Sequence, residues 1–366
     1  MNKISTDILK TKQHFEVLDG LRGIAAIAVV VFHFMEMWIS DYSKNFIAHG
    51  FLAVDFFFCL SGFVIGYAYD DRIKEMGVKE FFKSRMIRLH PLVILGSILG
   101  LLTFLFDPFG TYQEAYGIGR VLLIFLCSIF LIPFPTMTER SFNNFSFNAP
   151  AWSLFWEYIA NIFYVLILCR ISRRVLFVLT IISGGMLFYV CNRSGNISGG
   201  WGGDNFWDGS IRIAYSFMAG LFVYRSNWII KNKLGFIGMS VLLSLAFIMP
   251  YNDSWNWLTE SIVVLFYFPF LIAMGAGSVP AQGIKRLCSF SGKISYPLYM
   301  THYTVIWVFL NYYKSNHPST TQTTIIIATG TTLLIGIAYL TMVGYDIPIR
   351  KYLTSKRERI FNQAEK

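Results

Sequence analysis

Long, uninterrupted runs of apolar residues dominate the chain. Each run is roughly 17 to 22 residues long, the length that a helix needs to cross a hydrocarbon layer about 30 Å thick. Short polar stretches separate the runs, so the pattern predicts a chain that is almost entirely helix in a lipid bilayer. The predicted helical segments are 17–39, 51–69, 89–106, 119–135, 150–169, 174–191, 210–226, 235–250, 257–277, 292–313 and 323–343.

The composition predicts the same fold class. Of 366 residues, 55% are hydrophobic and 14% are charged, whereas soluble domains average about 25% charged residues. We therefore expect an all-α, polytopic transmembrane bundle that forms a single domain over 1–366. Within it we expect a cytoplasmic tail over 1–16, the bundle over 17–343 and a basic cytoplasmic tail over 344–366.

Basic residues mark one side of the predicted bundle. The net charge is +10, but the cations lie in short loops and near the C-terminus instead of in one stripe, which argues against nucleic acid as a partner. Loops rich in Lys and Arg stay on the cytoplasmic side of a membrane. This rule predicts that both termini are cytoplasmic and that the protein lies in the plasma (inner) membrane. The strongest basic clusters are Lys3, Lys10 and Lys12; Arg72, Lys74, Lys79, Lys83, Arg85 and Arg88; and Arg170, Arg173 and Arg174.

The number of crossings follows from the two cytoplasmic termini. They require an even number of crossings, so one of the predicted segments does not cross. Segment 119–135 ends in Ile132-Pro133-Phe134-Pro135, and proline removes a backbone donor and interrupts a helix. We therefore predict that 119–135 is re-entrant or peripheral and that ten helices cross. The five cysteines contain no CxxC pair, so we expect no disulfide framework and no metal site.

Two ionisable residues stand out in the first segment. A charge near the middle of a membrane helix costs about 2.5 to 3.5 kcal/mol on insertion scales, so it needs a partner or a function. Arg22 and His33 are eleven positions apart, which places them on one helix face with about 16 Å between them along the axis. His33 is either a base or a buried histidine satisfied by a carbonyl, and Arg22 is either part of a site or a headgroup anchor.

The second segment carries Asp55 at a depth close to that of His33. A carboxylate there could accept from one imidazole nitrogen of His33 and leave the other nitrogen as a base. The alternatives are that Asp55 caps its helix or pairs with Lys44.

The fifth segment begins with Trp152, Ser153 and Glu157 on one helix face. Glu157 is a candidate second carboxylate near His33 or a contact for a sugar hydroxyl. It could instead be only the structural partner of a buried polar residue.

Two further groups of polar residues lie near the predicted cytoplasmic face. Arg85 and Arg88 precede the third segment three positions apart, where paired guanidinium groups can bind phosphate or simply anchor the helix. Ser295, Tyr299 and His302 follow i, i+4, i+7 spacing in the tenth segment. This spacing predicts a polar stripe that lines a cavity or a packed polar seam.

Five of these blocks, in this order, resemble the acyltransferase type 3 family of integral membrane acyltransferases. They are Leu18-Asp19-Gly20-Leu21-Arg22-Gly23 with His33; Val54-Asp55-Phe56-Phe57-Phe58 to Leu60-Ser61-Gly62-Phe63; Arg85 with Arg88; Trp152-Ser153-Leu154 with Glu157; and Ser295-Tyr296 with Tyr299 and His302. The resemblance covers essentially the whole chain.

The resemblance implies an acyl-CoA donor, usually acetyl-CoA, that binds from the cytoplasm as a substrate and not as a permanent cofactor. It implies that His33 is the essential base and that Arg22, Arg85 and Arg88 contact the donor. The expected acceptor is a hydroxyl of an extracytoplasmic carbohydrate or glycolipid. The family's frequent extra esterase-like domain is not seen in this sequence, so we expect the stand-alone membrane form.

The resulting hypothesis is an O-acyltransferase with Asp55 or Glu157 orienting His33, and with Trp152, Ser153, Ser295, Tyr299 and His302 lining the pocket. The main alternative is a proton-coupled transporter or flippase, since buried Asp, Glu, Arg and His would also suit a carrier. Such folds often contain a repeated half, and no repeat is visible here.

Overall fold

The computed structural model describes residues 15–110 and 115–364, with side-chain surroundings up to residue 359. These residues form helices and connecting loops, and they contain no β-strand. The helices are α2 (Glu16–Trp38), α3 (Ala53–Tyr69), α4 (Ile73–Leu105), α5 (Ile118–Ile129), α6 (Ala151–Leu166), α7 (Arg173–Ser194), α8 (Phe206–Arg225), α9 (Gly235–Phe247), α10 (Asn256–Ile262), α11 (Phe268–Ala276), α12 (Lys285–Asn316), α13 (Thr320–Thr341) and α14 (Ile347–Ala364).

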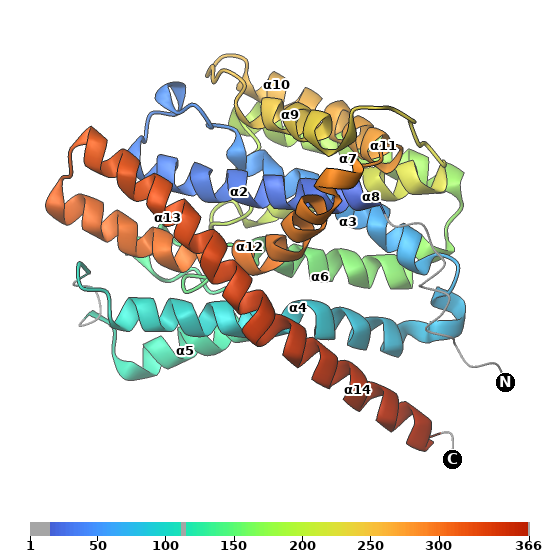
Figure 1. The fold of residues 1–366 in the computed structure, drawn as a ribbon, viewed down its shortest axis with the longest axis horizontal. Coiled ribbons are helices and arrows are strands. Elements are labelled where there is room, and N and C mark those ends of the chain that lie inside the picture. The colour runs from blue at the N-terminus through green and yellow to red at the C-terminus, as the bar shows by residue number, and fades with distance from the viewer. Residues whose placement is uncertain (1–14, 111–114, 365–366) are drawn as a thin grey trace.

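Helix α2 lies in the middle of the bundle (Figure 1) and packs most extensively against α12. The two helices run parallel at close range because glycines face the contact. A Cβ added at Gly20 would lie 2.4 Å from Cys288 Sγ, and one added at Gly23 would lie 2.0 Å from Ser291 Oγ. Small residues at such positions allow membrane helices to approach closely. This fixed register also sets which side chains of α2 and α12 meet further along.

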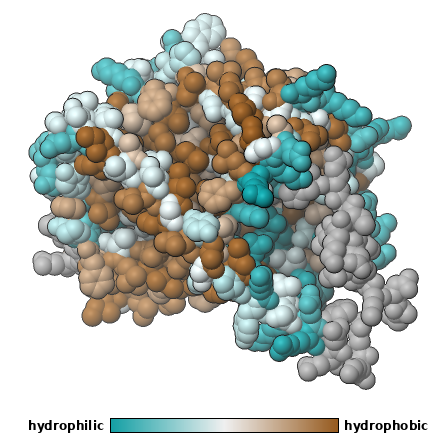
Figure 2. Space-filling view, in the orientation of Figure 1, coloured by the Kyte–Doolittle hydropathy of each residue, from teal (hydrophilic) through white to brown (hydrophobic). Residues whose placement is uncertain are grey.

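The outer surface of the bundle is apolar. On α7, Val178, Ile181 and Ile182 are more than half exposed, and Figure 2 shows brown, hydrophobic side chains over much of one face. Large contiguous apolar surfaces are rare on soluble monomers. The exposed apolar surface therefore indicates contact with lipid.

Seven helices of the described residues are long and apolar enough to span a membrane. Helices α8 and α12 are 20 and 32 residues long but too polar to be counted among these seven. The α5 helix has 12 residues and α9 has 13, which gives each a length of only about 18 to 20 Å. The short α5 agrees with a segment that does not cross, whereas α9 is shorter than the predicted segment 235–250. The count of ten crossings stays a prediction.

The connections fall at two opposite ends of the bundle. Those at 70–72 and 167–172, both predicted to be cytoplasmic, lie at the end toward which α14 extends, and the α12–α13 turn at 317–319 lies at the other end (Figure 1). The grouping matches the charge pattern, but the cytoplasmic identity of this end stays a prediction. Lys3, Lys10 and Lys12 of the predicted N-terminal tail lie outside the described residues.

The predicted C-terminal tail over 344–366 is largely helix instead. A π-helical turn, Met342–Asp346, joins α13 to α14 without a loop. Tyr345 OH donates a hydrogen bond of 3.1 Å to the Pro91 carbonyl, and Arg357 Nε lies 3.9 Å from Glu80 Oε2. These contacts with α4 order a segment whose polar sequence alone is typical of a tail. Helix α4 likewise begins at Ile73, so most of the predicted loop 70–88 is helical.

Candidate active site

A large cavity opens among α2, α3, α4, α6, α12 and α14. Its volume is about 810 Å³, within the range of roughly 300–1,000 Å³ that small-molecule sites occupy. The walls are apolar near α3 and strongly charged near α14 and the start of α4. The ionisable residues that line it are Asp19, Arg22, Arg85, Arg88, Glu157, Lys293, Asp346, Arg350, Lys351 and Glu358, together with the tyrosines Tyr296 and Tyr299.

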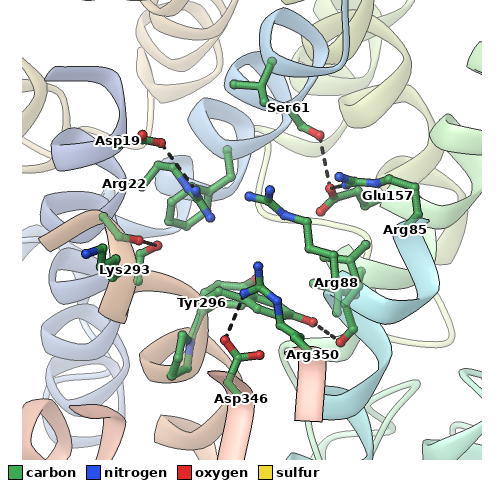
Figure 3. A pocket seen from close by; sticks show the side chains of 18 of the residues that line it. Asp19, Arg22, Ser61, Arg85, Arg88, Glu157, Lys293, Tyr296, Asp346 and Arg350 are labelled. Carbon is green, nitrogen blue, oxygen red and sulfur yellow. Dashed lines mark hydrogen bonds and ion pairs between the residues drawn. The ribbon is translucent and has the colours of Figure 1, made fainter. Parts of the chain in front are cut away.

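Three guanidinium groups point toward one another in this cavity. They belong to Arg22 of α2, Arg88 of α4 and Arg350 of α14 (Figure 3). Among the described residues, Arg88 makes no hydrogen bond or ion pair. Like charges that converge in a cavity repel one another, and an arginine cluster is a typical phosphate or carboxylate site. The arrangement is therefore suited to an anionic ligand.

Carboxylates hold three of the four arginines in position. Arg85 Nη2 lies 2.7 Å from Glu157 Oε1, which also accepts a 3.1 Å hydrogen bond from Ser61 Oγ. Arg350 Nη1 lies 3.0 Å from Asp346 Oδ2, and Arg22 Nη1 lies 3.7 Å from Asp19 Oδ1. The prediction that Glu157 could orient His33 is therefore wrong for this structure, because its carboxylate is bound to Arg85.

The inner end of the cavity is closed by a buried hydrogen bond between Ser153 Oγ and Tyr299 OH, which are 2.8 Å apart. Both residues line the cavity, as does Ser295. Trp152 does not, although it was predicted to. Its ring instead lies under the guanidinium of Arg212, 5.0 Å from the Arg212 Cζ. Neighbouring positions on α6 thus face the cavity and the buried core respectively.

His33 lies beyond this inner end and does not line the cavity. Its Nδ1 is 2.7 Å from Glu36 Oε2, and Tyr42 OH donates a 3.1 Å hydrogen bond to Glu36 Oε1. A carboxylate only accepts when ionised, so Nδ1 carries the proton of the neutral imidazole and Nε2 carries the lone pair. Glu36 was not predicted, although it lies three residues after His33 and its i, i+3 spacing could have indicated it.

His302 stands between His33 and the cavity. The His302 ring stacks on His33 with centroids 5.5 Å apart, and it contacts the ring of Tyr299 at 5.9 Å. His302 Nδ1 lies 2.9 Å from the Tyr299 carbonyl, which can only accept, and its buried Nε2 has no partner. The parallel register of α2 and α12 brings these two histidines together.

Asp55 is not a partner of His33, and this prediction is also wrong for the structure. The carboxylate receives Arg212 Nη2 at 2.6 Å and Arg212 Nε at 3.1 Å, and both side chains are almost completely buried. The proposed alternative partner, Lys44, pairs with Asp41 instead. Arg212 lies in the predicted segment 210–226, where an ionisable residue should have been recognised as needing a partner.

An all-helical bundle with seven membrane-competent helices and an internal arginine-lined cavity is a multi-pass membrane protein with an anion site. The sequence profile described as "Acyltransferase domain" matches residues 15–342. The chain belongs to this family, the acyltransferase type 3 family, and is an acyltransferase.

Relatives of this chain carry the name O-acetyltransferase. O-acetyltransferase OatA of Staphylococcus aureus strain NCTC 8325 / PS 47 is 26% identical over 362 residues, which cover 91% of this chain and 57% of the relative. OatA of strain COL of the same species matches to the same extent. The chain spans about half the length of the curated relatives that it matches. No solved structure matches it.

Proposed function

We propose that the protein transfers an acyl group, in the simplest case acetyl, from acyl-CoA to a hydroxyl of an extracytoplasmic carbohydrate or glycolipid. The observation that carries the proposal is the arrangement along α2. Arg22 lines the charged cavity, and His33 lies about 16 Å further along the same helix. That separation is comparable to the length of the pantetheine arm between the CoA phosphates and the thioester.

The donor enters the cavity with its phosphates among Arg22, Arg85 and Arg88. Arg88 supports this assignment because it makes no ion pair among the described residues and its guanidinium points into the cavity (Figure 3). The apolar walls formed by Phe57 and Leu60 suit the pantetheine arm. The thioester then lies near the inner end, at Ser153 and Tyr299.

The chemistry uses His33 as a general base. His33 Nε2 takes the proton of the acceptor hydroxyl while the hydroxyl oxygen attacks the thioester carbonyl carbon. The carbon–sulfur bond breaks, and the proton passes from the imidazolium to the departing CoA thiolate. Glu36 keeps Nδ1 protonated and stabilises the imidazolium that forms.

The reacting atoms must approach to about 3 to 3.5 Å for this step. In the structure, the rings of Tyr299 and His302 lie between the cavity and His33. Direct transfer therefore requires these rings to move aside when donor and acceptor are bound. His302 Nε2, which is buried and has no partner, is available to accept a hydrogen bond from a group that enters this layer.

The test uses the full-length protein purified in detergent. Acetyl-CoA should raise its thermal stability, and an acetyl group should appear on an added acceptor or, by slow hydrolysis, on water. Deleting the gene should remove an O-acyl ester from one cell-surface glycan, which identifies the acceptor. A protein that neither binds acetyl-CoA nor consumes it would contradict the proposal and favour a transporter.

A further inference from the structure

Helix α14 supplies cations to the cavity from outside the segment that matches the family. The match ends at residue 342, whereas Arg350 and Lys351 line the cavity, as do Thr354, Ser355 and Glu358 of the next turns. Arg350 and Thr354 are four residues apart, as are Lys351 and Ser355, so they share one face of the helix. One face of α14 therefore presents two cations and two hydroxyls to the ligand.

We propose that Arg350 and Lys351 form a subsite for the 3′-phosphate of the CoA ribose, separate from the site that Arg88 provides for the diphosphate. The proposal rests on the proposed function, since it assumes a CoA thioester in the cavity. It adds a residue pair that determines which donors the protein accepts. Donors that lack this phosphate would lose the contact.

The position of Arg350 within the cavity supports this division. Side-chain exposure increases from 5% for Arg85 to 25% for Arg22 and 41% for Arg350. In acetyl-CoA the thioester is at one end, the diphosphate is in the middle, and the 3′-phosphate lies on the far ribose. Since the thioester goes to the closed inner end, the most exposed arginine is the one that meets the 3′-phosphate.

The hydrogen bonding of Arg350 leaves it available for a ligand. Asp346 is 4% exposed and contacts Arg350 through one nitrogen, Nη1, at 3.0 Å. A guanidinium has five N–H donors in a fixed plane, so most of them remain free while the carboxylate fixes its direction. Figure 3 shows the Arg350 guanidinium pointing toward Arg88 and Arg22. Asp346 thus acts as a brace, in the same way that Glu157 braces Arg85.

The charges also match. Six cationic and four acidic side chains line the cavity, which leaves an excess of positive charge for an anion. A phosphomonoester carries about −1.5 to −2 charges near neutral pH, in addition to the diphosphate. Arg88 and its neighbours on α2 and α4 are suited to the diphosphate, and the remaining negative charge falls beside α14.

The experiment compares two donors, acetyl-CoA and 3′-dephospho-acetyl-CoA, on the full-length protein in detergent. Binding of CoA and 3′-dephospho-CoA is measured in parallel, so that the result does not depend on turnover. The variant is the double substitution Arg350→Gln and Lys351→Gln. The control is Lys356→Gln, which removes a charge from the same helix at a position that does not line the cavity. A second comparison is Arg88→Gln.

The wild type should bind CoA roughly tenfold to hundredfold more tightly than 3′-dephospho-CoA. The double variant should lose this preference while its affinity for 3′-dephospho-CoA stays unchanged, which also shows that it is folded. Arg88→Gln should weaken both ligands alike, and Lys356→Gln should affect neither.

Two results would overturn the subsite: a wild type that does not distinguish the two ligands, or a double variant that weakens both equally. Either result leaves the proposed function intact. Failure of the proposed function is recognised separately, because the wild type would then bind neither form of CoA.

Discussion

At the Arg22 end of α2, six cationic side chains from four helices line one cavity, whereas at the His33 end a single imidazole has a single carboxylate partner. The cations are partly exposed and lie at the mouth of an open space. His33 and Glu36 are mostly enclosed, and each occupies a defined hydrogen-bonding position. The two regions are thus built on different principles although one helix connects them.

The difference concerns redundancy. A multiply charged donor contacts several cations, so removing one weakens binding without abolishing it. A proton transfer needs one base in one tautomer, and no other group of the described residues lies in an equivalent position. Substitutions near His33 should therefore change kcat, and substitutions near Arg88 should change KM.

The largest effect is expected for His33→Ala. Removing a general base lowers turnover by about 10²- to 10⁴-fold, while the binding of acetyl-CoA should be unchanged because His33 does not line the donor cavity. Acetyl transfer and CoA binding are measured on the same purified protein. The control is His317→Asn, at an exposed turn whose positive φ of 46° asparagine tolerates. Wild-type turnover by the alanine variant would exclude His33 as the base.

The second prediction tests whether every buried carboxylate near His33 belongs to its region. Asp55→Asn leaves the Arg212 guanidinium buried without a charge partner, which should destabilise the protein by about 3 to 5 kcal/mol. Thermal unfolding in detergent measures the loss. Replacing both residues, Asp55→Asn with Arg212→Gln, should recover part of the stability. If the single variant were as stable as the wild type but inactive, Asp55 would have a catalytic role after all.

The third prediction concerns the carboxylate that His33 does contact. Glu36→Gln removes a charge-assisted hydrogen bond worth about 1.5 to 3 kcal/mol, so kcat should fall roughly tenfold to hundredfold with CoA affinity unchanged. Glu36→Asp should keep more activity than Glu36→Gln, because a carboxylate remains. A matched control is Glu139→Gln, which loses a similar contact with Tyr116 OH away from the cavity. A change in CoA affinity with normal kcat would remove Glu36 from this role.

The smallest effect is expected at the redundant end. Arg88→Gln should raise the KM for acetyl-CoA by about tenfold, equivalent to about 1.4 kcal/mol, and leave kcat nearly unchanged. Arg88 is the sharpest choice because its removal leaves no described carboxylate unpaired, whereas removing Arg85 would strand Glu157. Lys79→Gln, an exposed cation on the same helix that does not line the cavity, is the control. Normal donor affinity in Arg88→Gln would make Arg88 a simple anchor.

Much of the fold was predictable because apolar runs and helices coincide in a bilayer. Each predicted segment corresponds to a helix of the structure, including the short α5. Helix α14 and the first turns of α4 were not predicted, since their sequences are polar. They are ordered by contacts between segments far apart in the chain, such as Arg357 with Glu80, and no local pattern reports such contacts.

The candidate site was predictable in its residue types more than in its pairings. Arg22, Arg85, Arg88 and Glu157 do share one cavity. The partner of Asp55 is 157 residues away in sequence, so spacing alone could not identify Arg212. Depth arguments placed Asp55 and His33 at a similar level, but they say nothing about which way each side chain points around its helix.

The end of the family match at residue 342 has a consequence for comparing relatives. Two members that agree at every motif can still differ in donor choice, because Arg350 and Lys351 are encoded beyond the aligned segment. Grafting α14 from one member onto another would exchange that wall without touching His33. A protein shortened at the family boundary would retain the base but lose two of its six cavity cations.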